Sequence, residues 1–72
     1  MELREFIDAF PRDQRMEVRR MIADAHGVTE VTVRAWANGT RKHPYSIMAF
    51  EITESVTGGR VRREDLRPDI FG

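Results

Sequence analysis

The sequence contains no cysteine and few aromatic residues, with one Trp, one Tyr and four Phe among 72 residues. Without cysteine, neither a disulfide framework nor a thiolate metal site can stabilise a small core. A chain of this length has room for one core, so we expect residues 1–72 to form a single domain. Its stability must come from helix packing or from dimerisation.

An excess of charge of either sign is also missing, because 12 Lys and Arg residues balance 12 Asp and Glu residues. A strongly basic composition would have been the usual sign of a nucleic-acid partner. The charges are unevenly distributed, however. Residues 31–45 contain no acid and three cations, Arg34, Arg41 and Lys42. A neutral protein with such a basic edge can still bind phosphate groups.

Long hydrophobic runs are absent, and the first five residues lack the basic and apolar regions of a signal peptide. We therefore expect a soluble cytoplasmic protein with no membrane partner. An enzyme would need a nucleophile with its base, two carboxylates in different environments, or a metal. None of these is assembled here, and His26 and His43 have no cysteine or suitably spaced acid beside them. The sequence predicts no enzyme, no metal and no cofactor.

Turn-forming residues divide the chain into helix-sized pieces. The first piece, residues 2–10, has an apolar stripe with helical spacing, and the second, residues 11–26, ends at Gly27, which can adopt a left-handed conformation. We expect Val18, Met21, Ile22 and Ala25 to form the inward row of the second helix. The breakers are Pro11, Gly27, Asn38-Gly39, Pro44, Gly58-Gly59 and Pro68.

A third helix is expected from Thr29 to about Ala37. Thr29 is a good N-cap, and Glu30 in the first turn suits the helix dipole. The many β-branched residues here also allow a strand, but the caps and the core spacing of Val33 and Trp36 favour a helix. We expect these two residues, with Val28, to face the core. At this spacing Trp36 is a core residue rather than a platform for stacking bases.

A fourth helix is expected to open at Pro44 and to end at Gly58-Gly59. Its predicted inward stripe is Tyr45, Met48, Ala49, Ile52 and Val56. In the tail, residues 60–72, one short helical turn around Arg63 to Arg67 would pin apolar side chains on the core. Pro68 excludes a long helix there. The apolar side chains of the tail are Val61, Leu66, Ile70 and Phe71.

Two helices joined by a short turn that contains glycine form the layout of a helix-turn-helix, which residues 19–38 fit well. A small residue is needed where the helices cross and glycine where the turn needs a positive φ. The matching positions are Ile22, Ala23, Gly27, Val28, Val33 and Trp36.

With the segments that follow, the chain resembles the Cro-like and YdaS-type phage and prophage regulators over nearly its whole length. The segments that carry the resemblance are Trp36-Ala37-Asn38-Gly39-Thr40-Arg41, Ala49, Ile52, Thr57-Gly58-Gly59, Val61 and Leu66-Arg67-Pro68-Asp69-Ile70-Phe71. The resemblance implies an all-α, compact four- to five-helix lambda-repressor-like DNA-binding domain. It also implies a bacterial or prophage transcriptional regulator, usually a repressor that binds double-stranded operator DNA as a homodimer. Some relatives are described as antitoxins.

The same resemblance implies two sets of contact residues. The base-reading positions are Thr29, Glu30, Val31, Arg34, Ala35 and Asn38. The phosphate-binding positions are Arg19, Thr29, Thr40, Arg41, Lys42 and His43.

Several of these positions have two interpretations. Arg34 can bond a guanine edge or only a phosphate, and Glu30 can accept from a cytosine amino group or only serve the helix dipole. Val31 can contact a thymine methyl group. An alternative function is a protein-binding module, in which the same helix binds a toxin or another protein. The neutral composition and Glu30 favour that alternative.

Overall fold

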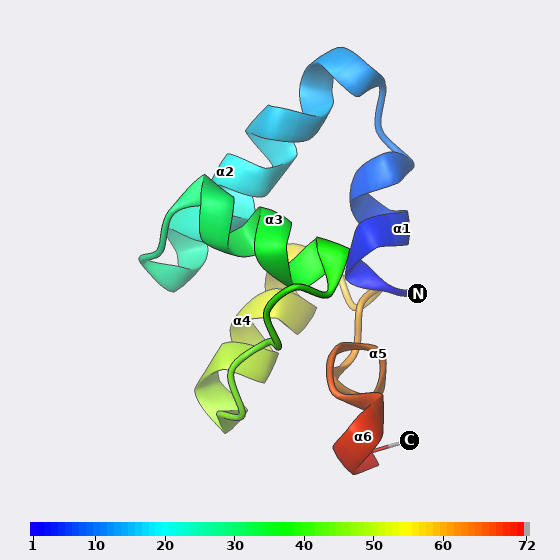
Figure 1. Cartoon of the computed structure of the whole chain (residues 1–72), viewed down its shortest axis with the longest axis vertical. Coiled ribbons are helices and arrows are strands. Elements are labelled where there is room, and N and C mark those ends of the chain that lie inside the picture. Colours follow the sequence, from blue (N-terminus) through cyan, green and yellow to red (C-terminus); the bar gives the residue numbers. More distant parts are fainter. Residues whose placement is uncertain (72) are drawn as a thin grey trace.

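The computed structural model describes residues 1–71, and every regular element in this part of the chain is a helix. The all-helical fold class is therefore confirmed. In Figure 1, α3 lies near the middle of the view, α2 extends above it, α4 and α6 extend below it, and α1 stands to its right. The elements are α1 Leu3–Asp8, a 3-10 turn Arg12–Gln14, α2 Arg15–His26, α3 Glu30–Asn38, α4 Ile47–Val56, α5 Arg63–Leu66 and α6 Pro68–Phe71.

The turn between α2 and α3 follows the sequence prediction closely. Gly27 has a φ of 70°, the left-handed conformation that ends α2. Two residues later the Thr29 hydroxyl accepts a hydrogen bond from the Thr32 backbone N–H at 3.3 Å and caps α3. Gly39, with a φ of 79°, ends α3. The helical interpretation of these β-branched residues is confirmed.

The main core lies where α1, α2 and α3 meet. Val33 of α3 and Ile22 of α2 are fully buried in it, and Trp36 packs against it while remaining partly exposed. The prediction that Val33 and Trp36 face inward is confirmed. Val28, in contrast, is exposed, because it lies in the turn between α2 and α3, outside the core. The buried residues of this cluster are Leu3, Phe6, Ile7, Val18, Ile22, Ala23, Val33 and Val61.

The predicted inward stripe of the fourth helix is correct only in part: Val56 packs against the core and Ala49 and Ile52 are partly buried, but Tyr45 and Met48 are not inward. The helix begins at Ile47, capped by the Ser46 hydroxyl, and not at Pro44. The side chains that it buries are Phe50, Thr53 and Thr57, whereas Tyr45 and Met48 are exposed. In α2, Met21 and Ala25 are likewise exposed rather than inward. A stripe based on hydrophobicity fails here because two of the buried positions are threonines.

Thr53 is buried at the centre of a polar cluster that joins α2, α4 and the loop before α4. Its hydroxyl lies 2.7 Å from His26 Nε2 and 2.9 Å from His43 Nε2. His43 Nδ1 lies 3.1 Å from the Pro44 carbonyl oxygen, which can only accept, so Nδ1 carries the proton. A neutral His43 then accepts from the Thr53 hydroxyl through Nε2, and the hydroxyl accepts from His26 Nε2–H. Burial lowers the pKa of His26 and lowers that of His43 to about 4.

The tail forms two short helices in place of the single expected turn, and the chain changes direction between them at Arg67. Pro68 occupies the first position of α6, where its missing N–H costs no hydrogen bond. Arg67 donates from Nη1 to the His43 carbonyl oxygen at 3.2 Å and from Nη2 to Asp69 at 3.0 Å. The tail is thereby tied to the loop that follows α3.

Candidate nucleic-acid interface

The outer face of α3, which we define as Val31, Arg34, Ala35 and Asn38, points away from the core that Val33 occupies. Val31 is 63% exposed, whereas Val33 has no exposed surface. The two valines are on one helix but serve opposite sides of it, because successive positions turn by about 100°. The structure therefore brings the predicted base-reading side chains of the outer face onto one helix surface.

Glu30 lies at the edge of this surface and binds two arginines at once. Its Oε2 lies 2.6 Å from Arg19 Nε and 3.3 Å from Arg34 Nε, and its Oε1 lies 2.9 Å from Arg34 Nη2. These hydrogen bonds and the nearby positive charges lower the pKa of Glu30. The Glu30 side chain is only 15% exposed. Its carboxylate is therefore occupied within the protein, which argues against the interpretation that it contacts cytosine.

The pairing fixes Arg34 in a defined orientation. Glu30 contacts the side of the guanidinium formed by Nε and Nη2, which leaves the edge formed by Nη1 and Nη2 with free N–H groups. That edge is the one that can bond the O6 and N7 atoms of guanine together. The spacing of four residues between Glu30 and Arg34 was a readable signal for this ion pair, and sequence reasoning missed it. Arg19 could not be paired with Glu30 from spacing.

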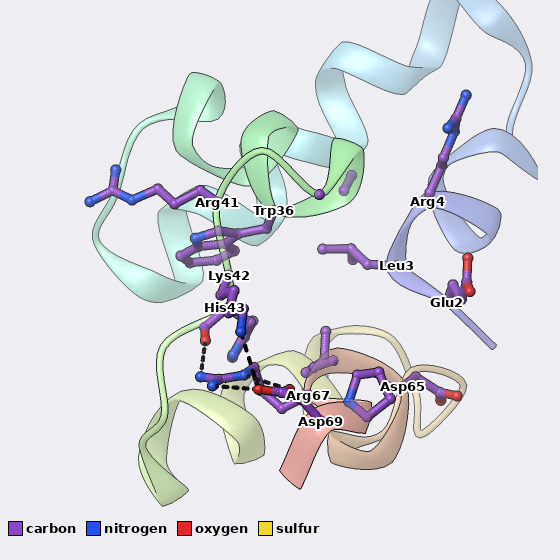
Figure 2. Close-up of a pocket in the computed structure, with 14 residues that line it drawn as sticks. Glu2, Leu3, Arg4, Trp36, Arg41, Lys42, His43, Asp65, Arg67 and Asp69 are labelled. Carbon is purple, nitrogen blue, oxygen red and sulfur yellow. Dashed lines mark hydrogen bonds and ion pairs between the residues drawn. The ribbon is translucent and has the colours of Figure 1, made fainter. Parts of the chain in front are cut away.

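The loop after α3 supplies the remaining predicted phosphate contacts. The Thr40 hydroxyl and the Arg41 backbone N–H both donate to the Ala35 carbonyl oxygen, at 3.3 and 3.2 Å. Figure 2 shows the Arg41 side chain pointing away from the other labelled residues. Within residues 1–71, no acid lies within ion-pair distance of Arg41. Arg41 is therefore well placed to contact an external anion.

Lys42 and His43 differ from the sequence expectation. Lys42 Nζ lies 3.3 Å from Asp69 of α6, so an acid distant in the sequence does compete for this cation. Both side chains are exposed, and an ion pair of this kind is weak enough for phosphate to replace it. His43 is only 3% exposed and its ring is engaged with Thr53. The prediction that His43 binds phosphate is wrong, because its side chain belongs to the interior.

A pocket of about 320 Å³ lies between α1, the end of α3 and the tail (Figure 2). Its apolar lining includes Leu3, Trp36 and Leu66, and the charges around it are largely paired with each other, as Arg67 is with Asp69. No group of three or more potential metal-ligating side chains occurs in residues 1–71. Over the same residues no helix has the length and apolar character needed to cross a bilayer.

Comparison with known proteins gives a family for this arrangement. A family model described as "Bacterial toxin YdaS" matches residues 18–72, which include most of α2 and all of α3, α4 and the tail up to residue 72. Neither the curated proteins nor the solved structures contain a significant match. Because the family model covers well over half of the 72 residues, the chain belongs to the YdaS family.

Proposed function

We propose that this protein is a sequence-specific DNA-binding regulator, a repressor of the phage or prophage kind, that inserts α3 into the major groove of operator DNA. The observation that carries the proposal is the outer face of α3, where an exposed apolar residue, Val31, lies beside an arginine already oriented by Glu30. Such a pair suits a thymine methyl group and a neighbouring guanine. The abrupt, glycine-stopped turn before α3 lets the capped end of the helix project, as helix-turn-helix docking requires.

Affinity in this proposal comes from contacts to the sugar–phosphate backbone. Arg41 and Lys42 extend from the loop at the C-terminal end of α3, and Arg19 lies beside its first turn. Contacts to phosphate position a protein on the duplex, whereas contacts to base edges select the sequence. The two roles are therefore assigned to different residues, which makes them separable by mutation.

The test is a mobility-shift and footprinting titration on the intergenic DNA beside the gene, with the variants Arg34→Ala and Lys42→Ala. Arg34→Ala should lose discrimination at one base pair in each half-site, by about 1–3 kcal/mol. Lys42→Ala should weaken all sequences equally and reduce the salt slope by about 1. Wild-type binding by both variants would contradict the proposal.

A second candidate function is binding of a protein partner within a toxin–antitoxin or prophage module. The family description as a bacterial toxin favours it, as does an exposed apolar surface away from α3. We name this surface the apolar end; it consists of Tyr45, Ile47, Met48, Ile70 and Phe71. If the wild type shifts no duplex while a copurifying protein binds through α3 or through the apolar end, this candidate replaces the DNA-binding one.

Dimerisation through the apolar end is part of the proposed function. In Figure 1 the start of α4 and α6 lie at one end of the longest axis, and α3 lies near its middle. The molecule is 33 Å long, so two copies joined at their apolar ends would hold their α3 helices about one molecular length apart. This length is close to the ~34 Å between half-sites one helical turn apart on DNA.

Met48→Glu should convert the dimer into a monomer, because it places a charge in the most exposed part of the apolar end. Met16→Glu is the matched control, since Met16 is an exposed methionine in the first turn of α2. Figure 1 shows that the start of α2 and the start of α4 lie toward opposite ends of the longest axis. Sedimentation equilibrium at micromolar concentration measures both variants. A wild-type protein that is monomeric both free and on DNA would exclude the dimer.

A further inference from the structure

A polar cleft of about 230 Å³ lies between α1, α2 and α3, and four arginines line it. Arg4 comes from α1, Arg15 and Arg19 from α2, and Arg34 from α3. Sequence reasoning assigned roles to Arg19 and Arg34 but none to Arg4 or Arg15. The convergence of four guanidinium groups from three helices needs a physical reason, because like charges in one cleft repel each other.

The acids around the cleft hold these arginines by one side only. Asp8 lies 3.8 Å from Arg4 Nε, and Glu30 lies 2.6 Å from Arg19 Nε and 3.3 Å from Arg34 Nε. A guanidinium held at Nε keeps N–H donors on its terminal nitrogens, although one Nη2 donor of Arg34 is also bonded to Glu30 Oε1, at 2.9 Å. The carboxylates therefore orient the arginines and leave donors available in the cleft.

Arg15 is fixed by the backbone and also lies beside Asp8, whose Oδ1 is 3.8 Å from Arg15 Nη1. Its Nε donates to the Phe10 carbonyl oxygen and its Nη2 to the Asp8 carbonyl oxygen, each at 3.0 Å. These bonds cap the end of α1 and hold the Arg15 charge at the wall of the cleft. A cation fixed in this way contributes its charge without losing further side-chain freedom when an anion binds.

The charge of the cleft suits a phosphate group. Four arginines face two acids, Asp8 and Glu30, so two positive charges remain in excess. Planar guanidinium groups bond phosphate oxygens in pairs, and a phosphodiester brings one negative charge. An apolar or cationic ligand would leave the excess charge uncompensated.

The position of the cleft identifies the source of the phosphate. Figure 2 places Arg4 and Arg41 on opposite sides of the C-terminal end of α3. A helix in the major groove has a sugar–phosphate backbone on each side of it. We propose that the arginine cleft binds one DNA backbone phosphate, on the side of α3 opposite to the one that Arg41 contacts. This inference rests on the proposed function: Arg34, at the edge of the cleft, keeps its role at the guanine edge, and Arg4, Arg15 and Arg19 hold the phosphate.

Arg4→Gln tests the cleft, with Arg20→Gln as the matched control. Both arginines are exposed and pair with an acid on their own helix, but Arg20 does not line the cleft. Arg4→Gln should weaken binding to every duplex by the same factor and lower the salt slope by about 0.9, the value for one lost phosphate contact. Arg20→Gln should keep the affinity and slope of the wild type. Thermal melting confirms that both variants fold.

A titration of the free protein with inorganic phosphate, against chloride at equal ionic strength, separates the cleft from DNA binding. The Nε–H NMR signals of Arg19 and Arg34 should shift and saturate with phosphate, and Arg4→Gln should abolish the saturation. Equal shifts in chloride would overturn the cleft as a phosphate site. Wild-type DNA binding with no effect of Arg4→Gln would overturn the inference alone. A wild type that binds no duplex would overturn the proposed function and the DNA-backbone assignment together.

Discussion

Phe50→Ala should remove most of the stability of the domain. The Phe50 side chain is 1% exposed and stacks on the His43 ring at a centroid distance of 5.4 Å. The Phe71 ring lies edge-to-face with the Phe50 ring, also at a centroid distance of 5.4 Å. Truncation of a buried Phe costs about 3–5 kcal/mol, while a domain of this size has a total stability near the lower end of about 5–15 kcal/mol. Urea denaturation at neutral pH measures the loss.

Tyr45→Ala is the control for this prediction. Tyr45 also contacts the Phe50 ring, at a centroid distance of 6.1 Å, but it is 68% exposed. Its removal should cost less than about 1 kcal/mol, because little of its surface leaves water on folding. Equal losses in the two variants would show that Phe50 is not the buried anchor of α4.

Thr53→Val should cost about 2–4 kcal/mol although the two side chains have nearly the same shape. The substitution removes the hydroxyl that bonds both His26 and His43, so one partly buried donor and one buried acceptor lose their partners, at about 1–3 kcal/mol each. Thr53→Ser keeps the hydroxyl and should cost only about 1 kcal/mol for the lost methyl group. Chemical denaturation of both variants at pH 7.5 gives the comparison.

The pH dependence of wild-type stability provides a second measurement on the same cluster. Burial holds the pKa of His43 at about 4 in the folded protein, below the value of about 6.5 in the unfolded chain. Above pH 6.5 both states are neutral and no stability is lost. As the pH falls from about 6.5 to 4 the unfolded chain binds a proton that the folded protein does not, so stability should fall by up to about 3 kcal/mol. A flat profile across this window would contradict a buried, neutral His43.

Local signals explain why the sequence predicted α3, the end of α2 and the turn between them, whereas α2 begins at Arg15, after a separate 3-10 turn, and not at Pro11. Gly27, Thr29 and Gly39 act through their own φ angles and their own hydrogen bonds, which depend on residues no more than a few positions away. The face of α4 could not be predicted in this way. Thr53 is buried because His26, 27 residues earlier, satisfies its hydroxyl, and hydrophobic periodicity carries no information about such a partner.

In the candidate site, too, contacts between residues close in the sequence could be predicted, whereas contacts between distant elements could not. The Glu30–Arg34 pair is separated by one helical turn and was readable from the sequence. The Glu30–Arg19 pair and the Lys42–Asp69 pair join elements whose relative position only the folded chain sets. His43 was misassigned because a histidine between a basic loop and a proline looks exposed until the packing around Phe50 is known.

The linked contacts of α3 determine how its recognition surface can change during evolution. Val31 contributes no polar contact within residues 1–71, so a substitution there changes what the helix offers to a partner at little cost to the fold. Arg34 differs, because its replacement leaves Glu30 with one of its two arginine partners. The carboxylate that orients Arg19 is then held less firmly. Descendants of this protein should therefore acquire new targets first through position 31, and through position 34 only when positions 19 and 30 change with it.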